Sequence, residues 1–539
     1  MTEKFSSPVQ VILLTAGIAC WQMFFELHEN ADTYFLFNLG RYIFEHGFPH
    51  VDPFTIHENL QLVAQQWLSA IFFWEAYKNF GVDGLRLADM ICGAMLVLMY
   101  WRLCLYVSGG KKALSFGLSF FVALVVTPMI VPRPQIISTL LLLSEVFLLE
   151  KFTRTKNFKF LLPLPILSML LINFHAAMWL MSLVVCLPFL FVKDFRHVKF
   201  LLAAMGGIFI GGLINPYGVE AMTYVFRSYG VELINNNVHE MFTPTAHNWT
   251  GKIFYFTEAF VIISLAKFKV PWRYIFLSGG IIFMAVMHER SMILFYFLAT
   301  FPIAYACKDF ALKKFGGFQA LPLIMFILLV LINTAIITTL LGDGLKISLP
   351  LKFLFFVSTL FAVYNLLILK VEGRILHPTI LPRKIFSLFA TAVIVSGIFL
   401  TTLVKDKVQI DEPFTAAIKF LLQSERPENI SLYVNQGIGG TAGHFRIRYY
   451  IDSRSEVFIT ANNGRKNILA EYLNLMNGKL DYKDFFSRYN FTHIIVSSDE
   501  LIYKPLSNDK NFRVIYESER VEDYEVTRYK IFVPKESHQ

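Results

Sequence analysis

Charged side chains are scarce in this sequence of 539 residues. Asp, Glu, Lys and Arg together make up 17% of the chain, against about a quarter in ordinary soluble domains. Apolar residues make up 55%, and the mean hydropathy is +0.51. A soluble protein of this length has no need of so large an apolar fraction. The composition therefore excludes an ordinary soluble enzyme and indicates a protein that spans a membrane.

Cysteine is also sparse, and its distribution excludes a disulfide scaffold. The chain has five cysteines, all in apolar runs: Cys20, Cys92, Cys104, Cys186 and Cys307. Their spacing matches neither a metal site nor a disulfide framework. We expect them to be buried as small hydrophobic groups.

Long apolar runs fill residues 8–404, and none follows. Because a helix needs about 20 apolar residues to cross a bilayer, we expect about 13 transmembrane helices. The predicted spans are 8–27, 84–107, 113–131, 136–151, 160–173, 176–192, 199–214, 253–266, 272–287, 291–306, 319–342, 349–369 and 385–404. Residues 405–539 are rich in charge, so the chain divides into a polytopic α-helical membrane domain, 1–404, and a small soluble domain.

The net charge of +9 is explained by the short loops on one side of the membrane. If Met1 is cytoplasmic, the loops expected inside are the basic ones, which is the positive-inside pattern. The charge therefore gives no reason to expect a nucleic-acid partner. An odd number of spans places the outer loops 28–83 and 215–252, and the domain 405–539, on the extracytoplasmic side. Membrane lipids are the expected surroundings of the transmembrane helices in residues 1–404.

The first outer loop carries an acid close to the membrane. Residues 33–46 have the periodicity of an amphipathic helix lying along the interface, with Asn38, Arg41 and Glu45 on one face. Extended backwards, this helix places Asp32 on the apolar side. An acid in that position is costly and is therefore a functional candidate. Asp is also a favoured N-cap residue, and the two interpretations are compatible.

Other polar side chains in the outer loops are candidates as well, each with a structural alternative. Asp52 precedes a proline and is equally well explained by a turn. Arg133 lies between two prolines, where it could bind a phosphate, a carboxylate or simply a lipid headgroup. The cluster His288–Ser291 stands between two apolar runs. This makes Arg290 the strongest binding candidate after Asp32.

Placed on one membrane face, these groups suit a substrate that is half lipid and half sugar. A carboxylate could take the proton of an acceptor hydroxyl while cationic side chains hold a leaving phosphate. The catalytic candidates are Asp32 and Asp52, and the donor phosphate candidates are Arg133, Arg290 and His288. The candidates for acceptor or sugar contacts are Gln66, His175, Asn215, Glu240 and Glu289. Asp32 and Asp52 could share a divalent cation, but no oxygen-ligand motif is present, so the sequence leaves a metal requirement open.

Short motifs follow one another in a recognisable order along the outer loops and the tail. They are Asp32, Gly40-Arg41-Tyr42, Glu45-His46-Gly47, Asp52-Pro53-Phe54-Thr55, Gln66-Trp67-Leu68, Arg133-Pro134-Gln135, Asn173-Phe174-His175, Asn215-Pro216-Tyr217-Gly218, Glu240, residues 288–291 and residues 449–456. Their order resembles that of bacterial multi-pass membrane glycosyltransferases of the GT-C fold superfamily, relatives of the lipid-phosphate-sugar-dependent mannosyl- and arabinosyltransferases. The resemblance covers nearly the whole chain.

This resemblance implies an inverting glycosyltransferase of the bacterial cell membrane. Its donor would be a polyprenyl-phosphate-linked sugar, and its acceptor a glycan, a lipid or a protein on the outer face. Asp32, in the first outer loop, would be the catalytic base.

Two departures from the family pattern leave alternatives open. The first acid of the usual pair is Asn30 here, and the usual His-Glu before Trp67 is Gln65-Gln66. Loss of these ionisable groups is consistent with a different acceptor or with an inactive homologue, and a fold does not determine a function. A non-catalytic lipid-linked glycan carrier or flippase, a glycan polymerase or ligase, and a scaffold with a polymer-binding tail also remain alternatives.

The tail, 405–539, is predicted to form a small α/β domain that covers the active-site face or holds an acceptor. Helices are expected at 413–423 and 465–478, and strands at 431–434, 446–451, 493–496, 512–516 and 524–533, the last two as a hairpin. The glycine-rich segment Gln436–Gly440 follows a strand. It is better explained by a turn than by a nucleotide loop, because no helix is expected before the next strand.

Overall fold

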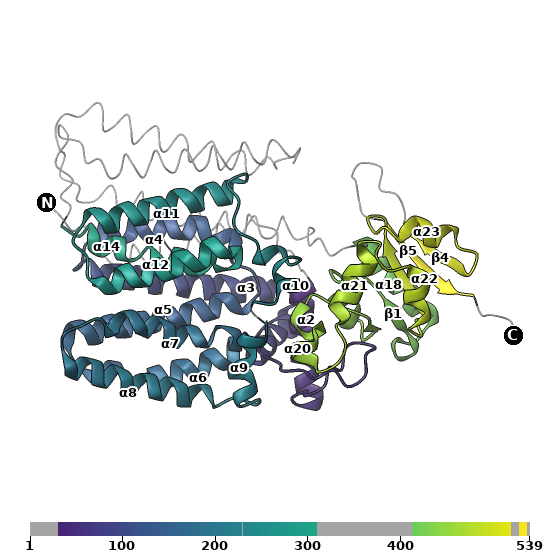
Figure 1. Ribbon diagram of the computed structural model, residues 1–539, viewed down its shortest axis with the longest axis horizontal. Helices are drawn as coiled ribbons and strands as arrows, with labels where there is room; N and C mark the ends of the chain where they lie inside the picture. The colour runs from purple at the N-terminus through teal and green to yellow at the C-terminus, as the bar shows by residue number, and fades with distance from the viewer. Residues whose placement is uncertain (1–13, 15–30, 229, 310–411, 519–527, 536–539) are drawn as a thin grey trace, which may run out of the picture.

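The computed structural model describes two parts of the chain, a bundle of helices and an α/β tail at one end of it (Figure 1). The described residues are Leu14, 31–228, 230–309, 412–518 and 528–535. Three helical stretches among them are long and apolar enough to cross a membrane: Trp67–Val107, Lys112–Met129 and Phe158–Met178. The predicted spans 319–342, 349–369 and 385–404, and nearly all of 8–27, lie outside the described residues. The count of about 13 spans therefore stays a prediction.

The helices of the bundle lie close to the predicted spans. The longer ones are α3 (Trp67–Val107), α4 (Lys112–Val126), α5 (Pro134–Thr155), α6 (Leu164–His175), α8 (Phe195–Gly212), α11 (Trp249–Lys267) and α12 (Trp272–Met287). The shorter ones are α7 (Leu180–Cys186), α9 (Val219–Ser228), α10 (Glu232–Asn235), α13 (Met292–Leu294), the π-helix Phe295–Ala299 and α14 (Pro302–Ala306). Their facing sides form one apolar core, which includes Leu96, Val146 and Tyr274. As expected, Cys92, Cys104 and Cys186 are buried in it, and Cys307 is partly buried.

Helix α3 joins a surface helix to a membrane span through a kink. At Gly81 the backbone has φ +60°, which favours glycine, and the helical conformation is interrupted there. The kink separates the amphipathic residues 67–80 from the predicted span 84–107. The kink therefore lies where the sequence pattern predicted that the first loop returns to the bilayer.

The tail contains a five-stranded mixed sheet with helices around it. Its strands are β1 (Ser431–Tyr433), β2 (Arg448–Tyr449), β3 (His493–Ser497), β4 (Phe512–Glu517) and β5 (Tyr529–Pro534), in the order β2-β1-β3-β5-β4. β1 pairs in parallel with β2 and β3, whereas β5 is antiparallel to β3 and β4, which confirms the pairing of the last two strands. The helices are α18 (Glu412–Ser424), α19 (Gly439–His444), α20 (Thr460–Asn463), α21 (Ile468–Met476), α22 (Tyr482–Ser487) and α23 (Tyr503–Asn508).

The amphipathic helix predicted at residues 33–46 is α2 (Ala31–His46), and both of its sides are in contact with other parts of the chain. Its apolar side packs on α3, and its polar side contacts α19 of the tail. The Nδ2 group of Asn38 donates to the carbonyl of Gly440 at 2.8 Å. Arg41 donates to two further carbonyls of α19, at 2.9 and 3.0 Å. The polar face predicted from the periodicity exists, but the tail covers it.

The glycine-rich segment 436–440 leads into α19, a helix that the sequence pattern did not predict. Gly443 lies where α19 crosses α2. A Cβ atom added there would lie 2.7 Å from Nδ2 of Asn38 and 2.8 Å from a ring carbon of Tyr449. Glycine at this crossing therefore allows the two helices to approach closely.

A buried ion cluster joins the tail to the first outer loop. Arg454 donates Nη1 to Oδ1 of Asp52 at 2.6 Å, and Nη2 lies 2.7 Å from Oδ2 of Asp452. The guanidinium also lies over the ring of Phe35, 4.4 Å from its centroid. The second oxygen of Asp52 accepts hydrogen bonds from the backbone and the hydroxyl of Thr55, at 3.0 and 2.8 Å. The side chains of Arg454, Asp52 and Asp452 are at most 5% exposed, so each buried charge is stabilised by its oppositely charged partners.

We expect Arg454→Met to loosen the tail from the membrane part. Asp52 and Asp452 would remain as buried acids without a counter-ion, and breaking such a cluster costs about 3–5 kcal/mol. The matched control is Arg446→Gln, which breaks the exposed ion pair with Glu45 and should cost less than about 1 kcal/mol. Thermal unfolding and limited proteolysis of the tail in detergent measure the difference. Equal unfolding midpoints for the two variants would contradict this role of Arg454.

Candidate functional site

Arg133 joins two outer loops that are distant in sequence into one ionic cluster. Its Nη2 lies 2.6 Å from Oδ2 of Asp32, and its Nη1 contacts Oε1 of Glu240. Arg133 directly precedes α5 and is extended, with φ −135° and ψ 155°, as expected for a residue before Pro134. Its side chain therefore lies between the first turn of α2 and the 3₁₀-helix His239–Met241.

The turn that carries Arg290 is held against the loop that carries Glu240. The ring of His288 lies 2.8 Å from the carbonyl oxygen of Met241 through Nδ1. The backbone N–H of Glu289 donates to the carbonyl of the next residue in that loop at 2.9 Å. These contacts of His288 and Glu289 place the guanidinium of Arg290 beside the cluster around Arg133.

Burial and charge oppose each other at Glu240. Burial would raise the pKa of its carboxyl group, but the charges of Arg133 and Arg290 outweigh burial and hold the pKa below its usual value. Glu240 is therefore a carboxylate at neutral pH.

Glu456 adds a carboxyl group from the tail. It lies in the 3₁₀-helix Ser455–Phe458, and Gln65 donates Nε2 to its Oε1 at 3.1 Å. Burial raises the pKa of Glu456 even though Arg290 and Arg454 act in the opposite direction. The two glutamates of the cluster therefore differ in their affinity for protons.

Three polar atoms of the cluster and its surroundings are buried without a hydrogen-bond partner among the described residues. They are Nε of Arg133, Oε1 of Gln65 and Oε1 of Gln135. Buried polar atoms in native proteins nearly always have a partner, which can be water or a ligand. Two guanidinium groups beside three carboxyl groups can hold an anion and also accept a proton.

The structure brings together some of the predicted site residues and places others in packing contacts. Asp32, Arg133, Glu240, His288, Glu289 and Arg290 belong to the cluster or hold it. Asp52 is instead buried in the ion cluster around Arg454. Asp32 and Asp52, considered above as joint ligands of a divalent cation, therefore pair with different arginines. Among the described residues, no group of three or more His, Cys, Asp or Glu is arranged to hold a metal ion.

The remaining predicted contact residues, Gln66, His175 and Asn215, lie at helix ends and in turns. Gln66 directly precedes α3, and the backbone carbonyl of its neighbour Gln65 accepts a hydrogen bond from Ala176 at 2.8 Å. His175 is 1% exposed, with Nδ1 2.9 Å from a serine hydroxyl of α5. Asn215 closes its own turn by donating to two backbone carbonyls, at 2.8 and 3.0 Å. Contacts of these residues with an acceptor stay predictions.

The tail residues of the site lie in the motif 449–456, to which the sequence analysis assigned no role. Asp452, Arg454 and Glu456 are charged at every second position, directly after the buried residues Tyr449–Ile451. Alternating charge of both signs next to a buried strand was the available signal. It could not indicate the partners, because these belong to the first outer loop.

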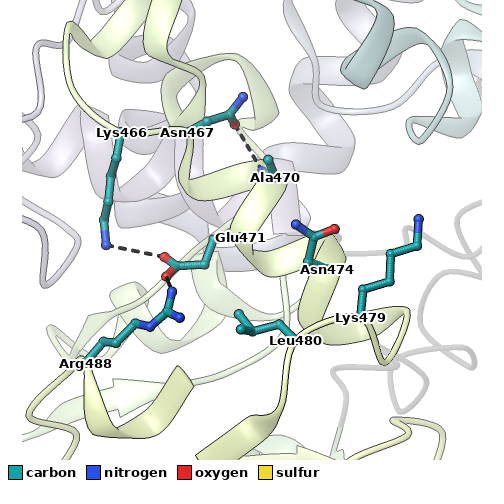
Figure 2. Close-up of a pocket in the computed structure, with 8 residues that line it drawn as sticks. All are labelled: Lys466, Asn467, Ala470, Glu471, Asn474, Lys479, Leu480 and Arg488. Atoms are coloured by element: carbon teal, nitrogen blue, oxygen red, sulfur yellow. Dashed lines mark hydrogen bonds and ion pairs between the residues drawn. The ribbon is translucent and has the colours of Figure 1, made fainter. Parts of the chain in front are cut away.

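A cleft in the tail lies apart from this cluster. It has a volume of about 380 Å³ and is lined by Lys466, Asn467, Ala470, Glu471, Asn474, Lys479, Leu480 and Arg488. Figure 2 shows Glu471 between Lys466 and Arg488, which donate to it at 3.3 and 3.1 Å. None of the residues that line the cleft belongs to the predicted site, so the cluster around Arg133 is the candidate functional site.

Solved structures identify the fold, although no family model and no curated protein sequence matches the chain. The oligosaccharyltransferase of Archaeoglobus fulgidus in the apo form matches with a TM-score of 0.52 and 13% identity, over 92% of this chain and 70% of that one. The same organism's oligosaccharyltransferase AglB, in complex with an inhibitory peptide and a dolichol-phosphate, matches with a TM-score of 0.53 and 11% identity, over 90% and 68%. The chain has the GT-C fold.

This result confirms, at the level of the fold, the GT-C resemblance that the motifs indicated. ArnT from Cupriavidus metallidurans, bound to undecaprenyl phosphate, also matches, with a TM-score of 0.48 and 12% identity over 99% of both chains. In this GT-C chain the helices α2 and α10, which neighbour the cluster, lie where the bundle meets the tail (Figure 1).

We expect Arg133→Gln to move the acid limit of stability to higher pH. The pKa of Glu240 is lower in the folded protein than its ordinary value of 4.5. Its ion pairs therefore stabilise the fold fully above that pH, and this contribution is lost as the pH falls through the lower, folded value. Without Arg133 the pKa of Glu240 is depressed less, so its pH-dependent stabilisation is smaller and is fully lost at a higher pH.

Thermal unfolding of the purified protein from about pH 3 to about pH 6 measures this shift. Glu240→Gln should remove the same pH-dependent component. Identical profiles for the wild type and Glu240→Gln would show that this ion pair does not contribute.

Proposed function

We propose that this protein transfers a sugar from a polyprenyl-phosphate carrier to an acceptor on the outer face of the membrane. The observation that carries the proposal is the Asp32–Arg133–Glu240 cluster, in which a carboxylate that could act as a base lies beside a phosphate-binding type of cation. The GT-C fold supports this chemistry, and AglB, which shares the fold, has been solved with dolichol-phosphate, a lipid phosphate.

Arg133 and Arg290 would hold the donor phosphate. A guanidinium binds two phosphate oxygens at once, and fixed cations stabilise the negative charge that develops on a leaving phosphate. His288 would act by holding the turn of Arg290, since its ring bonds a backbone carbonyl. The apolar part of the carrier would remain in the bilayer beside the bundle, with the outer loops and the tail in the extracytoplasmic space.

Asp32 would act as the general base in a single displacement. It accepts the proton of an acceptor hydroxyl while the acceptor oxygen forms a bond to the anomeric carbon of the sugar. The bond between that carbon and the phosphate oxygen breaks, and its electron pair leaves with the polyprenyl phosphate. Attack from the face opposite to the leaving group inverts the configuration at the anomeric carbon. Gln65 and Glu456, on the tail side of the cluster, are then the nearest groups for contacts with the acceptor.

A glycan ligase or polymerase would use the same site with a larger donor. The likeness to an oligosaccharyltransferase is the reason to include lipid-linked oligosaccharides among the donors that are tested. A carrier or flippase has less support among the described residues. Glu145, an ionisable group near the middle of the predicted span 136–151, is 1% exposed and accepts hydrogen bonds from Ser182 and Cys186 at 2.6 and 3.3 Å. It is packed between helices rather than exposed to a path for a polar headgroup.

We expect purified protein in lipid vesicles to transfer radiolabelled sugar from a polyprenyl-phosphate donor to an acceptor. Asp32→Asn should lower the rate by about 10²–10⁴-fold, the usual contribution of a general base. Glu45→Gln is the matched control and should retain the wild-type rate, because Glu45 lies on the same helix but pairs with Arg446. Wild-type turnover by Asp32→Asn would rule out Asp32 as the base. No turnover with any donor would overturn the transferase proposal.

A further inference from the structure

Both terminal nitrogens of Arg133 contact a carboxylate. Nη2 lies 2.6 Å from Asp32, and Nη1 contacts Glu240. A phosphate that binds a guanidinium through two oxygens needs two of its N–H groups. The edge formed by the two terminal nitrogens can bind two phosphate oxygens, and both of these nitrogens already contact a carboxylate. A phosphate bound at this edge therefore competes with Asp32 and Glu240 for Arg133.

Asp32 is the carboxylate that loses less when it leaves Arg133. It lies in the first turn of α2, a helix of 16 residues. Backbone N–H groups at the N-terminus of such a helix stabilise a negative charge. Glu240 lies in a 3₁₀-helix of three residues, which gives little comparable support, and its ionised state depends on the two arginines.

We propose that the donor phosphate and Asp32 exchange at Arg133, so that the base stays paired with Arg133 until the donor binds. This inference rests on the proposed function, because the displacing group is the phosphate of the sugar donor. The shared chemistry is a phosphate anion with at least two free oxygens.

The exchange would prepare Asp32 for catalysis in two ways. It removes a positive charge from the carboxylate, and it brings the negative charge of the phosphate close to it. The carboxylate is then no longer paired with the guanidinium and can accept the proton of an acceptor hydroxyl. The released carboxylate would remain next to the phosphate, which is bonded to the anomeric carbon under attack. The donor would therefore bind before the acceptor is activated.

A double-mutant cycle on binding tests the exchange without requiring turnover. The probe is undecaprenyl phosphate, titrated into the full-length protein in lipid nanodiscs. Asp32→Asn should bind it about fivefold more tightly than the wild type, because the competing partner of Arg133 loses its charge. Arg133→Gln should bind it more weakly, and the double variant Asp32→Asn/Arg133→Gln no more tightly than Arg133→Gln. Where Arg133→Gln does not fold, Arg133→Lys keeps the charge and removes the two-point geometry.

The matched control is again Glu45→Gln. Glu45 and Asp32 lie on the same helix, both side chains are 38% exposed, and both form short ion pairs with an arginine, at 2.7 and 2.6 Å. Glu45→Gln should leave the dissociation constant unchanged. Equal tightening by both variants would show a general effect of charge on the lipid phosphate and overturn the exchange.

The remaining outcomes separate this inference from the proposed function. The exchange is overturned if Asp32→Asn binds undecaprenyl phosphate no more tightly than the wild type, or if the wild type does not bind it. It is also overturned if Asp32→Asn tightens binding equally when Arg133 is replaced. If the protein transfers sugar but the effects of Asp32→Asn and Arg133→Gln on lipid-phosphate affinity are independent, the proposed function is supported and the exchange is overturned. If these effects are coupled but no acceptor receives sugar, the exchange is supported and the proposed function is overturned. Inorganic phosphate should bind more weakly than undecaprenyl phosphate in every variant, and equal affinity would identify a free phosphate as the ligand instead of a lipid carrier.

Discussion

The geometry of the candidate site depends on the packing of α2 between two other helices. On one side α2 contacts α3 of the membrane part, and on the other it contacts α19 of the tail. The contact with α19 is close because glycine stands at the crossing, where Gly443 lies against Asn38. Asp32 lies in the first turn of this helix. Its position relative to Arg133 is therefore set by the same contacts that attach the tail.

Two arginines in this region each lie between two carboxylates, and their surroundings give them different capacities. Arg454, with Asp52 and Asp452, is 5% exposed and is enclosed by aromatic rings. Arg133, with Asp32 and Glu240, is 20% exposed. A closed cluster resists exchange because every partner that leaves exposes a buried charge. A partly open cluster can accept a new anion, so the first arrangement suits the attachment of the tail and the second suits the binding of a substrate.

Part of the site could be predicted because its signals are local. The apolar runs, the basic loops and the position of Asp32 after the first run required only composition and periodicity. Arg133 between two prolines and the polar turn 288–291 were recognisable for the same reason. Residues 449–456 were recognised as a motif, but the roles of Arg454 and Glu456 were not, because their partners Asp52 and Gln65 lie in the loop 28–83. Helix α19 was missed because six residues that include three glycines carry no helical periodicity.

The sequence by itself determined that this chain is a membrane protein with an α/β tail, and that its unusual polar groups fall in the loops of one predicted side. Hydropathy and charge act over a few neighbouring residues, so they can be recognised without a fold. Only the tertiary structure decided that Asp52 attaches the tail, that Asp32 pairs with Arg133, and that the polar face of α2 is covered. Each of these depends on a contact between segments distant in the chain, and a residue's own neighbours do not specify which distant charge will compensate its burial.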